Sequence, residues 1–70
     1  MAEVLAPLAG KIVEILVSVG TSVAEDDELI VIEALKMENM VYASSGGTVK
    51  EVRVKKGDSV KDADILLVIA

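Results

Sequence analysis

The feature that most constrains the fold of this chain is an internal repeat. Residues 4–32 recur as residues 41–69, at an offset of 37 positions. Two copies are too few for a solenoid, which needs three or more units to bury a continuous core. The repeat therefore predicts two similar halves related by an approximate two-fold axis. The identical pairs include Val4/Val41, Ala6/Ala43, Gly10/Gly47, Glu14/Glu51, Val17/Val54, Gly20/Gly57, Ser22/Ser59, Val23/Val60, Asp27/Asp64, Leu29/Leu66, Val31/Val68 and Ile32/Ile69.

Each copy consists of short strand-like segments separated by turns. Hydrophobic residues make up 53% of the chain, and most are Val, Ile and Leu, which favour strands. Gly20 and Gly57 mark turns that need a positive φ, and each copy ends in an apolar strand at residues 29–32 or 66–69. No window has helical spacing, so we expect no α-helix. The predicted fold is all-β, a flattened antiparallel β-sandwich or barrel in one domain over residues 1–70.

Two local predictions follow from the repeat. In residues 49–56, Val52 and Val54 mark one face of a strand while Val49 is out of phase, which indicates a bulge or bend near Val49. The junction between the copies is the symmetry counterpart of the place where the chain ends meet. We therefore expect the junction and the two termini to lie at opposite ends of the molecule.

Composition excludes several classes of function. The net charge is −5, which disfavours nucleic acid and anionic membranes as partners. Tyr42 is the only aromatic residue, so platforms for stacking bases are missing. The chain has no Cys, which excludes a disulfide scaffold and a zinc–sulfur site, and it has no His, which excludes Ser–His and Cys–His catalysis within the chain.

The same features bear on location. The longest apolar run is residues 65–70, whereas a spanning helix needs about 20 residues, so no direct membrane insertion is expected. The start of the chain lacks the basic and apolar regions of a signal peptide. We expect a cytoplasmic protein, or a domain located in an organelle matrix if the chain is part of a longer protein.

The junction between the copies carries an unusual lysine. Lys36 stands between two large apolar residues, Leu35 and Met37, where one strand must turn into the next. Apolar residues of this size are normally buried, so their place beside a charge at an exposed turn conflicts with folding rules and indicates function. If Leu35 and Lys36 are the central residues of a two-residue hairpin loop, both require positive φ.

The stretch Glu33-Ala34-Leu35-Lys36-Met37 resembles the attachment motif of biotin carboxyl carrier domains, Glu-Ala-Met-Lys-Met, with Leu35 in place of the first Met. Residues 6–10, Ala-Pro-Leu-Ala-Gly, are similar to the Ala-Pro-Met-Pro-Gly segment of that family. The resemblance covers residues 3–70 and implies that Lys36 carries covalent biotin.

The resemblance also implies partners and roles. A biotin protein ligase is expected to modify Lys36, with Leu35 and Met37 forming the tip that it recognises. A biotin carboxylase would load carboxylate, and a carboxyltransferase or decarboxylase would receive it, so the domain is a carrier and not an enzyme by itself. Glu33, Ala34 and Glu38 are possible modulating residues, although Glu33 and Glu38 could equally be plain solvent-facing residues.

Two alternatives remain open at the sequence level. A lipoyl carrier is similar in fold, but it usually has an acidic residue before the lysine and Ala after it, where this chain has Leu35 and Met37. An unmodified β-sandwich could instead serve as an interaction module, with the apolar-flanked tip as its docking point.

The methionine after the tip has a structural interpretation: Met40 is expected to fill the core.

Other candidate sites have simpler explanations. The run Glu25-Asp26-Asp27-Glu28 lacks the alternating ligands and the Gly of a calcium loop, so a solvated acidic turn is predicted and no metal site. Residues 44–47, Ser-Ser-Gly-Gly, lack the Lys-Ser/Thr ending of a phosphate loop and are interpreted as a turn.

Overall fold

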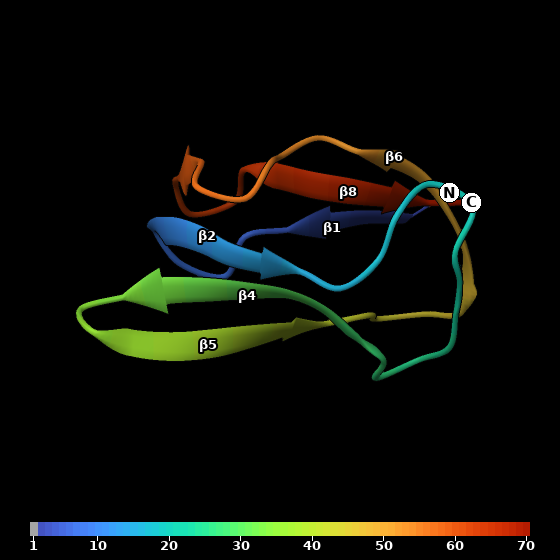
Figure 1. The fold of residues 1–70 in the computed structure, drawn as a ribbon. Helices are drawn as coiled ribbons and strands as arrows, with labels where there is room; N and C mark the ends of the chain where they lie inside the picture. Colours follow the sequence, from blue (N-terminus) through green and yellow to red (C-terminus); the bar gives the residue numbers. More distant parts are fainter. Residues whose placement is uncertain (1) are drawn as a thin grey trace.

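The computed structural model describes residues 2–70, which form eight strands and no helix. The strands make two four-stranded antiparallel sheets, β1-β8-β6-β3 and β5-β4-β2-β7 (Figure 1). This confirms the predicted all-β fold. The strands are β1 (Ala2–Leu5), β2 (Gly10–Ile15), β3 (Ser22–Val23), β4 (Glu28–Ala34), β5 (Met37–Tyr42), β6 (Gly47–Val52), β7 (Ser59–Val60) and β8 (Ile65–Ile69).

The two halves of the chain are interlocked, because each sheet takes strands from both. The first half supplies β4 and β2 to the centre of one sheet and sends β1 and β3 to the two edges of the other. The second half does the same with β8 and β6 at a centre and β5 and β7 at the edges. Neither half could therefore complete a sheet alone.

The backbone hydrogen bonds repeat with the sequence offset. The N–H of Ile12 donates to the carbonyl of Asp58 at 2.8 Å, and the equivalent N–H of Val49 donates to the carbonyl of Thr21 at 2.9 Å. Gly57 donates to Ile12 at 2.7 Å, and Gly20 donates to Val49 at 2.8 Å. These bonds show that the predicted two-fold relation holds in the connecting loops as well as in the strands.

The core is entirely apolar in the described part of the chain. Its largest side chains are fully buried branched aliphatics drawn equally from both halves, and no polar or charged residue is buried. Full burial of one such side chain contributes about 1.5–3 kcal/mol relative to exposure. The core can therefore be built without aromatic residues. The largest fully buried residues are Ile12, Leu29, Ile30, Ile32, Leu66, Leu67, Ile69 and Val49.

The irregular alternation near Val49 has the predicted cause. The pairing of β6 with β8 shifts register between Val49 and Glu51. The equivalent pairing of β2 with β4 shifts between Ile12 and Glu14. An extra residue in each strand bends it and restores the inward direction of the following apolar side chain.

β5 begins at Met37, because its pairing with β4 continues as far as the turn itself. One sequence expectation about this strand needs correction. Met40 was expected in the core, but it is half-buried and lies outside the core cluster. β5 is an edge strand, so one side of it has no sheet neighbour to cover a side chain.

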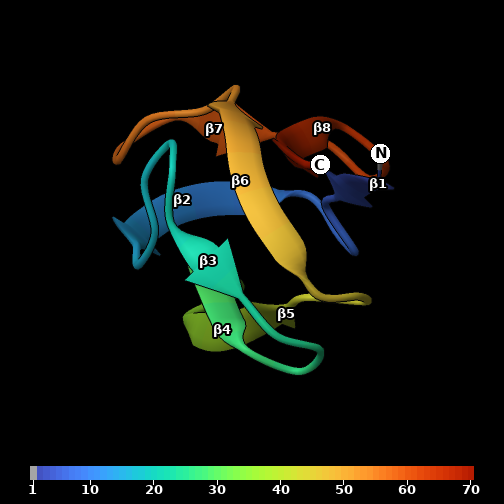
Figure 2. The same cartoon turned by 90° about the vertical axis from the view of Figure 1, so that its right-hand side faces the viewer.

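The β4–β5 turn and the chain ends lie at opposite ends of the molecule, as predicted (Figure 1). Ala2 pairs with Ile69, which brings the ends of β1 and β8 together. Figure 2 looks onto this remote end, where β3 and β6 also lie. The long dimension of the molecule is 31 Å, so the turn projects well away from the termini. A search of residues 2–70 found no helix with the length and apolar character needed to cross a bilayer.

Gly10 allows β2 to pack under the end of β4 that carries the turn. A Cβ atom at Gly10 would lie 2.5 Å from the carbonyl oxygen of Glu33 and 2.6 Å from Cγ2 of Ile32. Both distances are too short for real contacts, and the first involves backbone that cannot move away cheaply. Only glycine fits here, which explains its recurrence as Gly47, whose Cβ would meet Ala70 and Ile69.

We predict that Gly10→Ala lowers the free energy of unfolding by about 1–3 kcal/mol, the usual cost of forcing extra atoms into a packed site. Gly46→Ala is the comparison variant and should lose less, because its Cβ would lie 3.3 Å from the carbonyl oxygen of Val23, a contact that a shift of a few tenths of an ångström relieves. Urea denaturation followed by circular dichroism measures both. Equal denaturation midpoints for the two variants would show that the backbone of β4 at Glu33 moves away from the added Cβ atom at little cost in free energy.

Candidate functional site

The turn between β4 and β5 is a two-residue hairpin loop. Ala34 pairs with Met37, which leaves Leu35 and Lys36 as the central residues. Their φ values are +52° and +65°, so both adopt the left-handed conformation predicted from the sequence. This geometry matches the twist of the flanking strands, which is why two-residue hairpins favour it. Leu and Lys are costly in it because of their Cβ atoms, by about 1–2 kcal/mol each.

The three residues at the tip are all exposed. Leu35 is 96% exposed and Met37 66% exposed, and the lysine between them is exposed as well. Leu35 is therefore the most exposed of the large hydrophobic residues in the described chain. A large apolar side chain gains nothing for folding in this position, so the hypothesis of a functional tip stands on its geometry as well as on its sequence.

Two carboxylates flank the tip on neighbouring strands. Glu33 on β4 lies directly opposite Glu38 on β5, and both are exposed. Like charges directly opposite each other on an antiparallel pair are mildly destabilising. Lys11 on β2 lies opposite Glu33 on its other side, which offsets part of this repulsion. The structure thus brings both predicted modulating carboxylates close to Lys36 along the hairpin.

The acidic turn at residues 25–28 has a structural role that sequence reasoning missed. The carboxylate of Asp27 accepts a hydrogen bond from the N–H of Ala24 at 2.8 Å, and Asp26 has a φ of +71°. In the other half the carboxylate of Asp64 accepts from the N–H of Lys61 at 2.8 Å. The identity of Asp27 and Asp64 across the repeat was the available signal. No cluster of metal-ligating side chains was found among residues 2–70.

Two surface depressions of the molecule lie away from the tip. One is lined by residues of the second half, from Arg53 to Ile65, and the other lies between the edge strands β1 and β5. Neither is lined by Leu35, Lys36 or Met37. The tip is therefore not a pocket that receives a substrate. It is a projection that can enter a pocket of another protein.

An exposed primary amine on a projecting turn, opposite the chain ends and outside both of these depressions, has the geometry of a carrier domain. Such an amine can be acylated by an external enzyme, and the strands behind it hold it in a constant position. The scaffold itself needs no catalytic group for this role.

Comparisons with known proteins agree with this class. Residues 2–69 match the family described as "Biotin-requiring enzyme". The chain is 43% identical over 65 residues to the biotin carboxyl carrier protein of Streptococcus mutans, covering 93% of this chain and 50% of that protein. It is 44% identical over 61 residues to the human mitochondrial propionyl-CoA carboxylase alpha chain, covering 87% of this chain and 8% of that protein.

A solved structure shows the same fold. The crystal structure of the Kluyveromyces lactis urea carboxylase matches with a TM-score of 0.92 at 32% identity, covering 99% of this chain and 6% of that one. The chain belongs to the family of biotin-requiring enzymes, as one of its biotin carboxyl carrier domains. The resemblance seen in the sequence is thus confirmed, as are the family's cofactor, biotin, and the role of a non-catalytic carrier. The chain spans about half the length of the Streptococcus relative and a much smaller part of the carboxylases.

We predict that replacing Leu35 by Asn and Lys36 by Gly raises the free energy of unfolding by about 1–3 kcal/mol while removing the amine. Asn and Gly tolerate positive φ, so the strain at the turn is relieved. The measurement is the denaturant midpoint at unchanged m-value. A lower midpoint would mean that the side chain of Leu35 stabilises the fold more than its backbone conformation costs.

Proposed function

We propose that Lys36 is the residue to which biotin is joined, and that the domain carries a carboxyl group between two enzyme active sites. The observation that carries this assignment is the exposed position of Lys36 on the two-residue turn, with φ +65°, between Leu35 and Met37. No other lysine of the chain stands on a β-hairpin tip of this kind, among the residues that the structure describes.

The chemistry of this site fits the cofactor. Biotin has a carboxylic acid side chain, and a lysine amine joins such an acid through an amide. The turn presents Lys36 on a projection flanked by exposed apolar side chains, so a ligase can surround it. The direct neighbours in the turn, Leu35 and Met37, bring no charge that would compete for the amine.

Loading would use a biotin protein ligase and ATP. The Nζ atom of Lys36, in its neutral form, would attack the acyl carbon of biotin that the ligase has activated with AMP. A carbon–nitrogen bond would form, the bond from the acyl carbon to the phosphate oxygen would break, and AMP would leave. The ligase would have to accept the proton that the amine loses.

Once bound, biotin supplies a ring nitrogen that can hold a carboxyl group. The contribution of this chain is positional: the paired strands β4 and β5 hold the backbone of Lys36 at the far tip, from which its side chain extends into solvent. Tethering raises the concentration of the carried group at both sites. The partners we propose are a biotin carboxylase and a carboxyltransferase or decarboxylase, which meet the domain in the cytoplasm or in an organelle matrix.

We predict that Lys36→Arg abolishes biotinylation and leaves the fold intact. Arginine keeps the positive charge and similar bulk, but its delocalised guanidinium is not a usable acyl acceptor. Intact-mass spectrometry after incubation with ligase, biotin and ATP would show one biotin on the unmodified chain and none on the variant. Peptide mapping that located biotin on a different lysine would refute the assignment.

The apolar neighbours give a second prediction. Leu35→Asp with Met37→Ala should reduce the kcat/KM of biotinylation at least tenfold, because the ligase loses both apolar contacts at the tip. The same change moves the tip toward the pattern of lipoyl carriers, so a lipoyl ligase is a useful second probe. Unchanged kinetics with the biotin ligase would show that Leu35 and Met37 do not contribute to recognition by that enzyme.

A further inference from the structure

The internal repeat supplies a built-in comparison for the surface around the tip. The loop of residues 55–61 at the tip end corresponds to the loop of residues 18–24 at the remote end. Both have the same backbone turns: Gly57 and Gly20 each have a φ of +94°, and both loops make the equivalent hydrogen bonds to β2 and β6. Differences between their side chains therefore do not arise from the needs of the fold.

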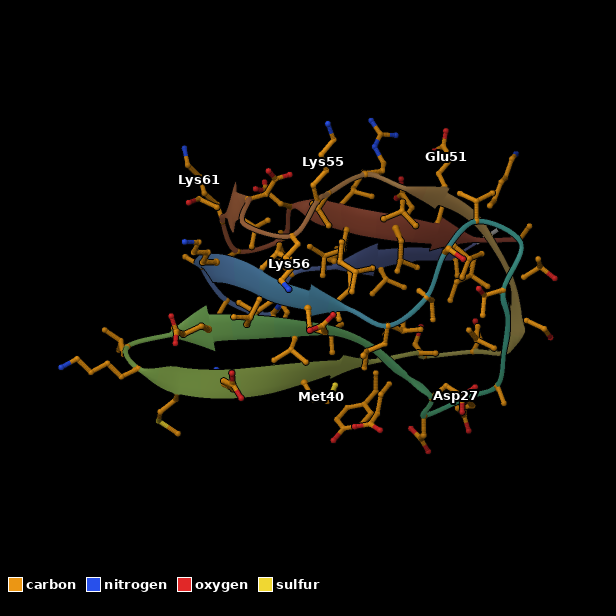
Figure 3. All side chains as sticks on the ribbon, viewed as in Figure 1. Asp27, Met40, Glu51, Lys55, Lys56 and Lys61 are labelled. Carbon is orange, nitrogen blue, oxygen red and sulfur yellow. The ribbon has the colours of Figure 1, made fainter. Side chains whose placement is uncertain are left out.

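The side chains at the two ends differ in charge. Lys55, Lys56 and Lys61 at the tip end stand where the remote loop has Ser18, Val19 and Ala24. Lys11 on β2, beside the tip hairpin, likewise corresponds to a neutral residue, Thr48. In each of these four pairs the cation is on the side of Lys36. In Figure 3, Lys61 lies toward the hairpin, Lys55 and Lys56 lie near the middle of the molecule's length, and Asp27 and Glu51 lie toward the other end.

The acidic turn of the first half adds to the contrast, although within the two loops Asp58 at the tip end stands where the remote loop has Thr21. Residues 25–28 are all acidic, whereas their counterparts at residues 62–65 are Asp-Ala-Asp-Ile. The segments at and beside the tip contain five of the seven Lys and Arg residues and five of the twelve acidic residues. These segments are residues 7–12, 32–38 and 55–64. Their formal charge is zero, so the rest of the chain holds the entire net charge of −5.

Two of the five carboxylates in these segments accept hydrogen bonds from the backbone of their own turns, and both residues remain exposed. The carboxylate of Asp58 accepts from the N–H of Lys55 at 2.8 Å, and that of Asp64 accepts from the N–H of Lys61 at 2.8 Å. Lys55 and Lys61 each belong to the turn that the carboxylate closes, and both side chains are exposed. The described part of the chain gives Lys55, Lys56 and Lys61 no ion pair. These three cations are therefore available to another molecule.

The distance from the tip suits a role in docking. Gly57 donates a hydrogen bond to Ile12, and Ile12 pairs with Ile32, three residues before Leu35 along β4. At the rise of a β-strand, the loop lies about 10 Å behind the turn. A protein that encloses Lys36 would bring the rim of its pocket close to these lysines, while the acidic remote end would stay in solvent.

We propose that Lys55, Lys56 and Lys61 form a docking surface for an acidic rim around the active site that receives Lys36, in the first place that of the biotin protein ligase. This inference rests on the proposed attachment at Lys36. The separation of charge steers the domain to approach tip first, since a negative surface repels the rest of the chain, with its net charge of −5, but not the tip-end segments, whose formal charge is zero. Lysines at such a rim act chiefly on the rate of association.

Two variants with equal net charge test the proposal. The tip-end variant carries Lys55→Gln, Lys56→Gln and Lys61→Gln. The control carries Ser18→Glu, Val19→Glu and Ala24→Glu at the equivalent remote positions. Each makes the chain more negative by the same three charges, and all six side chains are exposed. The kcat/KM of biotinylation by a biotin protein ligase is measured from about 0.01 M to about 0.15 M salt, over which the Debye length falls from about 30 Å to about 8 Å.

We expect the tip-end variant to lose about three- to tenfold in kcat/KM at low salt, with the difference from the unmodified chain narrowing as salt rises. The control should stay within about twofold. Equal losses in both variants, no loss in the tip-end variant, or faster modification of it would overturn the proposal. Mass spectrometry after long incubation separates this result from failure of the attachment assignment, because all three chains should still reach one biotin each if Lys36 is the acceptor.

Discussion

The exchange of strands between the two halves is the constraint on which the rest of this structure depends. Each half places two strands at the centre of one sheet and two at the edges of the other, so the apolar core closes only when both halves are present. The core consists of branched aliphatic side chains from both halves, with no buried polar group among the described residues. A chain of 70 residues has little apolar area to bury, and interlocking allows both halves to share one core. The closely packed glycine at residue 10, the paired bulges and the symmetric loop hydrogen bonds all serve this closure.

The interlocked core also explains how the molecule maintains a strained turn. Leu35 and Lys36 hold left-handed conformations that asparagine and glycine would adopt at lower cost. The cost is tolerated because β4 is paired on both sides, with β5 and β2, along most of its length. The turn is therefore imposed by its supporting strands, and its side chains are free to serve recognition. Strain of this kind, found at the residue proposed to carry the cofactor, is consistent with function taking precedence over local stability.

The near symmetry of the fold makes its departures from symmetry informative. Positions needed for closure recur in both halves, including Gly10 with Gly47 and the carboxylates of Asp27 and Asp64, which accept bonds from their own turns. Positions on the outer surface of the loops are not under this requirement, and there the two ends differ in charge. The hairpin that carries Lys36 and the lysines beside it belong to the asymmetric part. In a small duplicated fold, the residues that break the repeat at the surface are those to examine for recognition.

The sequence alone determined much of this protein. Its repeat showed which segments of the two halves are equivalent and predicted that Lys36 lies opposite the chain ends, because both follow from symmetry. The all-β class and the irregularity at Val49 follow from the local pattern of residues. The two-residue turn with positive φ at Leu35 and Lys36 was also predictable, since few hairpin geometries fit the spacing. Only the tertiary structure decided the exchange of strands between sheets, which depends on long-range pairing and not on local preference. It also decided the start of β5 at Met37 and the half-burial of Met40, because exposure on an edge strand depends on the absence of a neighbour that no sequence window contains.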